Sequence, residues 1–203
     1  MILQKKKKIS VKNTKEYKAV ENIMNARNLI KNLIDQIKEA QIKLGYVKET
    51  LRFYYPVSSL NNILGVNYSD ETAMLEALNE NPGFKDTVLG MLQFNIHGGR
   101  IEISVMQEGA EYVHRNVETP PFLFDLITLF GVCHDCSIYD ICRVFERYSH
   151  DYVCRKMQKN RDFDYVIFFK DKTIDEYYYC IRIEMGHTIY YRFMKEDFET
   201  LIS

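Results

Sequence analysis

The sequence predicts an α+β fold, in which an antiparallel sheet built from two meanders is packed with several helices. Strand-like alternation occurs in two separate groups, at about residues 90–117 and 152–194, and helical patterns lie between and around them. No strand–helix–strand rhythm typical of a parallel sheet is present. We therefore expect the two strand groups to merge into one antiparallel sheet.

A long N-terminal helix is predicted over about residues 21–44. Its apolar residues recur at alternating steps of three and four: Ile23, Ala26, Ile30, Leu33, Ile37, Ala40 and Leu44. Gly45 follows, where a left-handed residue would end the helix. The pattern covers only about three heptads, so packing across the sheet is favoured over pairing with a second copy, which stays open.

The first meander contains a hairpin around Gly98-Gly99. A two-residue turn at these glycines matches the apolar faces in one register: Ile96 with Ile101, Phe94 with Ile103, and Leu92 with Val105. Residues 110–117 are predicted to add a third strand. The segment 47–55 fits either a helix or a strand.

Further helices are indicated by caps and breakers: one that ends near Gly65, one that begins near Ser69, and one at 122–130 after Pro120-Pro121. Two more are expected from Ser137 to about Ser149, and from Lys195. Residues 152–157 are expected to enter the second meander as a strand.

The second meander alternates aromatic and β-branched residues over 162–193, which is typical of three antiparallel strands. Matching Ile183 with Ile189 and Ile181 with Tyr191 would place all odd-numbered residues on one apolar face. The other face would then carry a Tyr/Arg-rich surface with His187 at the turn: Tyr178, Arg182, Glu184, Tyr190 and Arg192. Tyrosine and arginine are enriched where proteins bind partners, although such pairs also stabilise sheets.

Composition indicates a soluble globular chain of 203 residues, with 46% hydrophobic residues, 27% charged residues and a net charge of −1. Residues 1–18 hold seven lysines and are expected to form a poorly ordered basic arm, with a single domain over 19–203. The near-neutral charge gives no reason to expect nucleic acid, and no apolar run is long enough for a membrane span. Five cysteines without a framework spacing favour a reduced, cytoplasmic protein.

Candidate chemistry is limited to cysteine and histidine. Cys133, Cys136, His150 and Cys154 have the letter spacing of a structural zinc site. The helix predicted between the two pairs would hold them about 20 Å apart, which disfavours metal binding. We therefore predict no metal site and no cofactor. No P-loop, dinucleotide fingerprint or nucleophile elbow is present.

The preferred hypothesis is a non-catalytic cytoplasmic binding domain that uses the Tyr/Arg-rich sheet face for a protein or small-molecule partner, as a monomer or weak homodimer. The alternative is a hydrolase-like or zinc-dependent enzyme that uses cysteine and histidine. A deep pocket with several converging titratable groups would favour the enzyme.

Several short motifs resemble an uncharacterised bacterial family, the domain of unknown function numbered 3877. They are Gly45-Tyr46-x-Lys48-Glu49-Thr50, Tyr54-Tyr55-Pro56, Ser59-Leu60, Phe163-Asp164-Tyr165-Val166, Tyr178-Tyr179-Cys180 and Gly186-His187. The likeness runs from about Leu29 to the C-terminus and leaves the lysine-rich arm outside. The resemblance implies no activity, cofactor or catalytic residue.

Overall fold

The computed structural model describes residues 26–133, 135–158 and 162–202. The expected basic arm at residues 1–18 lies outside this range. The chain divides into two compact units, which are described separately. The N-terminal unit contains the described residues up to Gln41 and Gly45–Val117, and the C-terminal unit contains Ile42–Leu44 and the residues from Glu118 onward.

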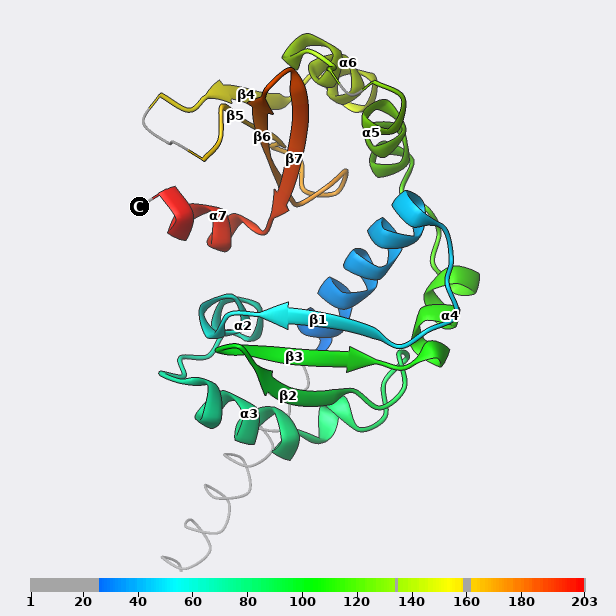
Figure 1. The fold of residues 1–203 in the computed structure, drawn as a ribbon, viewed down its shortest axis with the longest axis vertical. Helices are drawn as coiled ribbons and strands as arrows, with labels where there is room; N and C mark the ends of the chain where they lie inside the picture. Colours follow the sequence, from blue (N-terminus) through cyan, green and yellow to red (C-terminus); the bar gives the residue numbers. More distant parts are fainter. Residues whose placement is uncertain (1–25, 134, 159–161, 203) are drawn as a thin grey trace, which may run out of the picture. The chain divides into compact units, whose positions relative to one another are not determined.

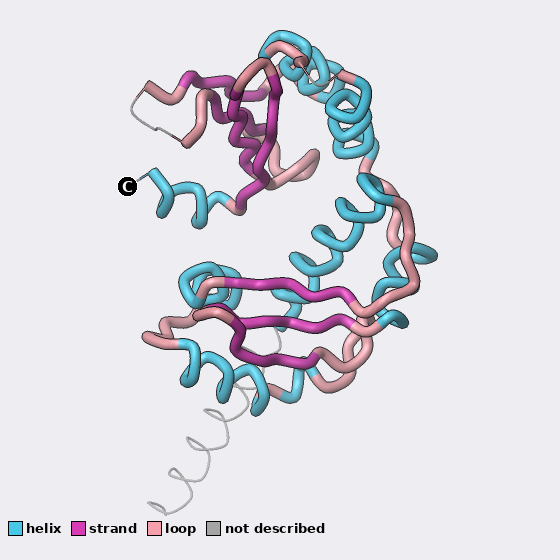
Figure 2. The backbone as a smooth tube through the Cα atoms, viewed as in Figure 1, coloured by secondary structure: helices cyan, strands magenta, loops and turns pink. Residues whose placement is uncertain are grey.

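The N-terminal unit is built on a three-stranded antiparallel sheet (Figure 2). Its strands are β1 (Leu51–Tyr55), β2 (Gln93–His97) and β3 (Arg100–Val105), in the order β1-β3-β2. Within the segment 47–55, which fitted either a helix or a strand, residues 51–55 form strand β1. The predicted hairpin is confirmed, because Ile96 pairs with Ile101 and Phe94 with Ile103. The strand pairing ends at Gln93 with Ser104, one step before the predicted pair of Leu92 and Val105.

The hairpin turn has the predicted chemistry. Gly98 and Gly99 both have positive φ, at 57° and 72°. A two-residue turn of this mirror-image type needs positive φ at both positions, where a side chain is costly. The turn therefore fixes the register that aligns the apolar faces of β2 and β3.

The long N-terminal helix is confirmed in its described part, residues 26–44. Leu29, Leu33 and Ile37 are fully buried in the core of the unit, whereas Leu44 is exposed, so the buried stripe does not follow the predicted heptads to their end. Gly45, with φ 81°, ends the helix as expected. The remaining helices before the hairpin are α2 (Val57–Leu64), α3 (Glu71–Glu80) and the single turn η1 (Pro82–Phe84).

The strand predicted at residues 110–117 is wrong, because residues 110–116 lie within helix α4 (Gln107–Asn116) and Val117 is its C-cap. Its buried residues Gly109, Ala110 and Val113 follow a helical spacing, which the aromatic and β-branched composition of the segment obscured. The third strand of this sheet is instead β1, which pairs with β3 along its whole length.

The C-terminal unit contains a four-stranded antiparallel sheet in the order β4-β5-β6-β7 (Figure 1). The strands are β4 (Tyr152–Lys156), β5 (Tyr165–Phe169), β6 (Tyr178–Glu184) and β7 (His187–Phe193). Helices α5 (Pro121–Val132) and α6 (Ile138–Tyr148) pack on one face, which forms the main core of the unit. Helix α7 (Lys195–Ile202) packs on the other face through Phe198. These elements confirm the predicted second meander and its flanking helices.

The expectation of one merged sheet is wrong, since the two strand groups form two separate sheets. Each group is completed by a strand from its own part of the chain, β1 in the first sheet and β4 in the second, and each sheet has its own buried cluster. That residues 19–203 behave as a single domain stays a prediction. In the described part of the chain, no helix combines the length and the apolar character needed to cross a membrane.

Two helical glycines should respond in opposite ways to alanine. A Cβ at Gly109 in α4 would lie 2.5 Å from the carbonyl oxygen of Leu89 and 2.6 Å from a methyl group of Val105, whereas a Cβ at Gly131 in α5 would meet nothing within 4 Å. We expect Gly109→Ala to lower the free energy of unfolding by about 1–3 kcal/mol through overpacking. Gly131→Ala should raise it by about 0.5–1 kcal/mol, because alanine is the better helix former.

Urea unfolding of the two variants beside the wild-type chain measures both effects. A stabilising Gly109→Ala would show that the helix does not approach Leu89 closely.

Candidate binding surface

The β6–β7 hairpin has a register one residue different from the predicted one. Met185 and Gly186 form a two-residue turn, so Glu184 pairs with His187 and Arg182 with Ile189. The prediction assumed a three-residue turn, in which Arg182 faces Tyr190. Met185 has φ 51°, a left-handed conformation that non-glycine residues seldom adopt, and this is why a two-residue turn was not expected at this sequence.

This register divides the predicted Tyr/Arg-rich surface between the two faces of the sheet. Directly paired residues point to the same side of an antiparallel sheet. Tyr178, Arg182 and Glu184 therefore share a face with Ile189 and Tyr191. Tyr190 and Arg192 lie on the opposite face, which packs on α5 and α6, so the six predicted site residues do not form one surface.

Arg192 belongs to a buried cluster inside the C-terminal unit. Its guanidinium lies 3.6 Å from the carboxylate of Asp175 and 3.6 Å from the centre of the Tyr177 ring. The side chains of Arg192 and Asp175 are only 8% and 6% exposed. The same carboxylate accepts hydrogen bonds from the backbone N–H of Tyr177 at 2.9 Å and from the hydroxyl of Tyr179 at 3.1 Å. Arg192 thus has a structural role.

The other predicted aromatic residues are also partly used in packing. Tyr190 contacts the ring of Phe130 on α5 at 4.8 Å, and the ammonium of Lys43 lies 4.5 Å from the Tyr190 ring centre. Tyr178 stacks between Phe168 and Phe198, with ring distances of 4.1 and 5.1 Å. Neither tyrosine presents a whole ring for a partner.

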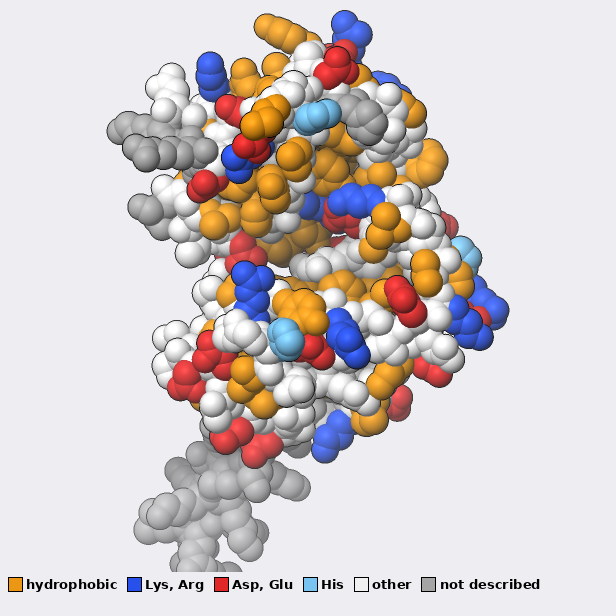
Figure 3. All heavy atoms as spheres, viewed as in Figure 1, with side chains coloured by type: hydrophobic (Ala, Val, Ile, Leu, Met, Phe, Trp, Pro, Cys, Tyr) orange, Lys and Arg blue, Asp and Glu red, His pale blue; other side chains and the backbone are white. Residues whose placement is uncertain are grey.

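A partner could still contact the hairpin near its turn, on the sheet face that also carries α7. We call Arg182, Glu184, Ile189 and Tyr191 the open hairpin face. Ile189 and Tyr191 are each 41% exposed, and Arg182 pairs with Glu184 at 3.1 Å in a partly exposed ion pair. Figure 3 shows apolar side chains gathered over these strands of the C-terminal unit. The predicted register places Ile189 and Tyr191 in the core. A two-residue turn at Met185-Gly186 moves them to the opposite face, so the length of the turn is the signal that identifies them.

Strand β7 is also an edge of the sheet, because it pairs with β6 alone. Its seven residues, His187–Phe193, contain no proline and no lysine. Edge strands that avoid pairing with other chains usually carry such residues or are very short. The opposite edge, β4, ends with the exposed residues Arg155 and Lys156. The two edges of this sheet therefore differ in their protection.

The cysteines are arranged differently from the zinc spacing. The thiol of Cys136 contacts that of Cys133, while the thiol of Cys154 contacts that of Cys142, which was not among the candidates. Burial, with the nearby Cys133 and Asp140, raises the pKa of Cys136 to about 11. Across the described residues, no three or more His, Cys, Asp or Glu side chains are placed to hold a metal ion together. A thiol whose pKa is raised in this way is a poor nucleophile at neutral pH, so Cys136 is not an activated nucleophile.

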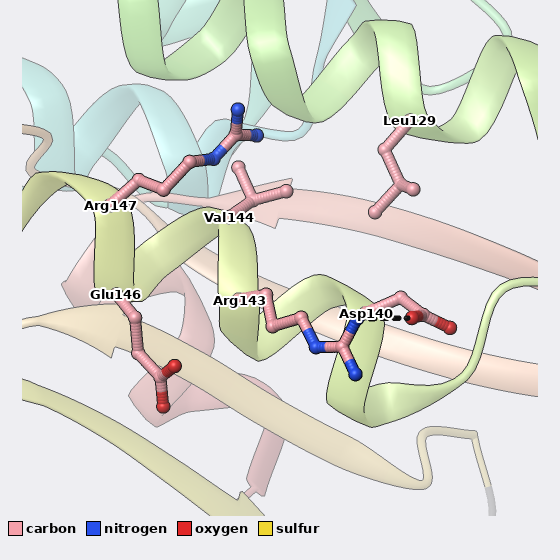
Figure 4. A pocket seen from close by; sticks show the side chains of 6 residues that line it. All are labelled: Leu129, Asp140, Arg143, Val144, Glu146 and Arg147. Carbon is pink, nitrogen blue, oxygen red and sulfur yellow. Dashed lines mark ion pairs between the residues drawn. The ribbon is translucent and has the colours of Figure 1, made fainter.

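A hollow of about 570 Å³ lies beside α5 and α6, lined by Leu129, Asp140, Arg143, Val144, Glu146 and Arg147 (Figure 4). Most of its charged side chains cap helix α6 or form ion pairs with residues of α5 and α6. Asp140 forms a capping box with Ser137, whose hydrogen bonds lower the pKa of the carboxyl group, and Arg143 reaches Asp140 at 4.0 Å. Arg147 pairs with Asp125 at 3.2 Å. The lining therefore has the character of a solvated helix surface and not of an acid–base site.

The left-handed conformation of Met185 gives a test of the turn. Asparagine tolerates this conformation better than methionine, so Met185→Asn should raise the free energy of unfolding by about 0.5–1 kcal/mol. Met185→Val should lower it by about 1 kcal/mol or more, because a β-branched residue is strained there. Thermal or urea unfolding measures both. Equal stability of the two variants would contradict the two-residue turn.

The two arginines should differ strongly in their contribution to stability. Arg192→Ala leaves the buried Asp175 carboxylate without its cationic partner and should cost roughly 3 kcal/mol. Arg182→Ala removes only a partly exposed ion pair and should cost about 0.5 kcal/mol or less. Urea unfolding of both variants under the same conditions provides the comparison. Similar losses for both would show that Arg192 is not buried against Asp175.

Comparison with known proteins gives one match. Neither the search of curated proteins nor the search of solved structures found a match for the chain. A family model described as "Domain of unknown function, E. rectale Gene description (DUF3877)" matches residues 26–202, which cover both units and every described helix and strand. The chain therefore belongs to the DUF3877 family, whose function is unknown.

Proposed function

We propose that this protein is a non-catalytic interaction domain that associates through the β6–β7 hairpin, and that the partner seated on strand β7 is a second copy of the chain. The observation that carries the proposal is the unprotected edge of β7 next to the open hairpin face. Pairing of edge strands uses main-chain hydrogen bonds for affinity and neighbouring side chains for specificity. A symmetric pair of identical strands is the simplest form of such an interface.

The sequence of β7 is self-complementary when two copies pair antiparallel about Tyr190. In this arrangement all seven residues of the strand have a partner. Ile189 then lies opposite Tyr191 of the second copy, and Arg192 lies opposite Thr188. Branched and aromatic side chains form favourable cross-strand pairs, and no like charges oppose each other.

Two kinds of alternative register are less suitable. A slip of one residue along either strand would join the open face of one sheet to the core face of the other, because successive side chains alternate. A slip that makes Arg192 face its own copy would oppose two guanidinium groups. The charge pattern thus disfavours the register about Arg192, and the register about Tyr190 is the one in which all seven residues of the strand have a partner.

The association is expected to be weak. Two paired strands and two small apolar patches bury less than the roughly 1,200 Å² at which stable, specific interfaces begin. A concentration-dependent homodimer fits this size.

We place the protein in the bacterial cytoplasm, a proposal supported by its five free cysteines and by the bacterial description of its family.

Two variants with complementary charges test the interface. Ile189→Lys and Tyr191→Glu should each weaken self-association about tenfold or more, because each places a charge in the apolar cross-strand pair. An equimolar mixture should recover association, since the introduced lysine and glutamate then face each other while the second Ile–Tyr pair stays intact. Sedimentation equilibrium over a concentration series measures the three affinities.

Ile183→Lys is the matched control. It makes the same chemical change on the same hairpin, at a partly exposed residue of β6, which is not at the edge. Its association should equal that of the wild-type chain. A wild-type chain that stays monomeric up to about 1 mM, or variants that fail to recover in the mixture, would overturn the proposal.

A further inference from the structure

Helix α6 runs back along the strand that follows it in the sequence. Phe145 on the helix contacts Tyr152 on β4, with ring centres 5.8 Å apart. A residue three positions before Phe145 lies about one helical turn away on the same side of the helix. A residue two positions after Tyr152 is the next one on the same face of the strand. These positions are Cys142 and Cys154, so the packing that joins the two rings also brings the two cysteines together.

The thiols of Cys142 and Cys154 are in hydrogen-bonding contact. Both cysteines are free, Cys142 is partly buried, and Cys154 as a residue is exposed at the outer strand of the sheet. We propose that Cys142 and Cys154 form a redox-active dithiol, which a low-molecular-weight disulfide of the glutathione type converts into an intrachain disulfide. This inference does not depend on the proposed homodimer.

The reaction follows from thiol–disulfide exchange. The more exposed Cys154 loses its proton and attacks one sulfur of the small disulfide, which forms a mixed disulfide and releases one small thiolate. Cys142 then loses its proton and attacks the sulfur of Cys154, which forms the intrachain bond and releases the second small thiolate. The two released thiolates take up the two protons. The protein dithiol is oxidised by two electrons, and the small disulfide is reduced to two thiols.

The surroundings favour the disulfide at equilibrium and slow its formation. Desolvation, together with the hydrogen bond that the protonated Cys154 thiol makes to the sulfur of Cys142, raises the pKa of Cys154 to about 12. The reduced form therefore gains nothing from a stabilised thiolate, which is the effect that makes some dithiols strong oxidants. Because exchange needs the thiolate, the rate at Cys154 should rise about tenfold for each pH unit between about pH 7 and 9.

The bond would fix α6 to the outer strand β4. A short closed loop restricts the unfolded chain, and the helix and the strand already contact each other in the folded state. We expect oxidation to raise the Tm by roughly 5 °C or more. Such a shift distinguishes closure between α6 and β4 from the simple attachment of a small thiol at an exposed site.

The test treats the full-length reduced chain with oxidised glutathione and follows intact mass, non-reducing peptide maps and Tm. The wild-type chain should lose the mass of two hydrogens in a form whose map joins the peptides of Cys142 and Cys154. Cys142→Ser should instead stop at a glutathione adduct on Cys154. Cys133→Ser is the control, because it removes the other thiol contact and should leave the 142–154 bond unchanged.

Three results would overturn the proposal. One is a wild-type chain that accumulates the glutathione adduct on Cys154 as the Cys142→Ser variant does. Another is a map that joins only Cys133 and Cys136. The third is a bond between Cys142 and Cys154 that leaves the Tm unchanged or lower. Such a result would mean that the two sulfurs reach each other only when α6 and β4 have separated.

Discussion

The register of the C-terminal sheet depends on the buried pair of Arg192 and Asp175. If β7 moved by one residue, Ile189 and Tyr191 would enter the core and Arg192 would leave it. The two apolar side chains are already more than half buried, so the hydrophobic gain is about 1 kcal/mol each. Stranding the Asp175 carboxylate costs roughly 3–5 kcal/mol. The charged pair therefore decides the register, although a buried ion pair adds little net stability by itself.

This balance explains which turn could be predicted from the sequence. At Gly98-Gly99, local turn chemistry and the alternation of apolar residues select the same pairing, so the register was correct. At Met185-Gly186 they disagree, because methionine disfavours the left-handed turn and the apolar pattern favours the other alignment. The true alignment rests on Asp175, a loop residue with no periodic pattern around it. A long-range contact of this kind cannot be read from one sequence.

In the rest of the fold, too, elements set by local sequence signals are predicted correctly, and elements set by long-range contacts are not. Helices with strong caps or apolar stripes, such as α6 with its Ser137 capping box, were placed within a residue or two. The strand predicted at residues 110–117 is wrong because its aromatic and β-branched residues suit a strand, and the packing of Gly109 against Leu89 is a tertiary contact that local composition does not encode. The division of the strands into two sheets likewise follows from packing around two separate cores.

The two edge strands of the C-terminal sheet, β4 and β7, differ in the features that oppose pairing with another chain. The β4 edge ends in Arg155 and Lys156, and Cys154 of this strand contacts Cys142 of α6. Charge opposes pairing at this edge, and a bond to α6 would hold the strand on the helix. The β7 edge has no lysine, and its one arginine, Arg192, is buried against Asp175, so its exposed face is apolar over a length that natural proteins normally protect. This difference between the two edges supports the proposal that β7 pairs with a second copy of the chain, because the β4 edge carries exposed charges that oppose such pairing and the β7 edge does not.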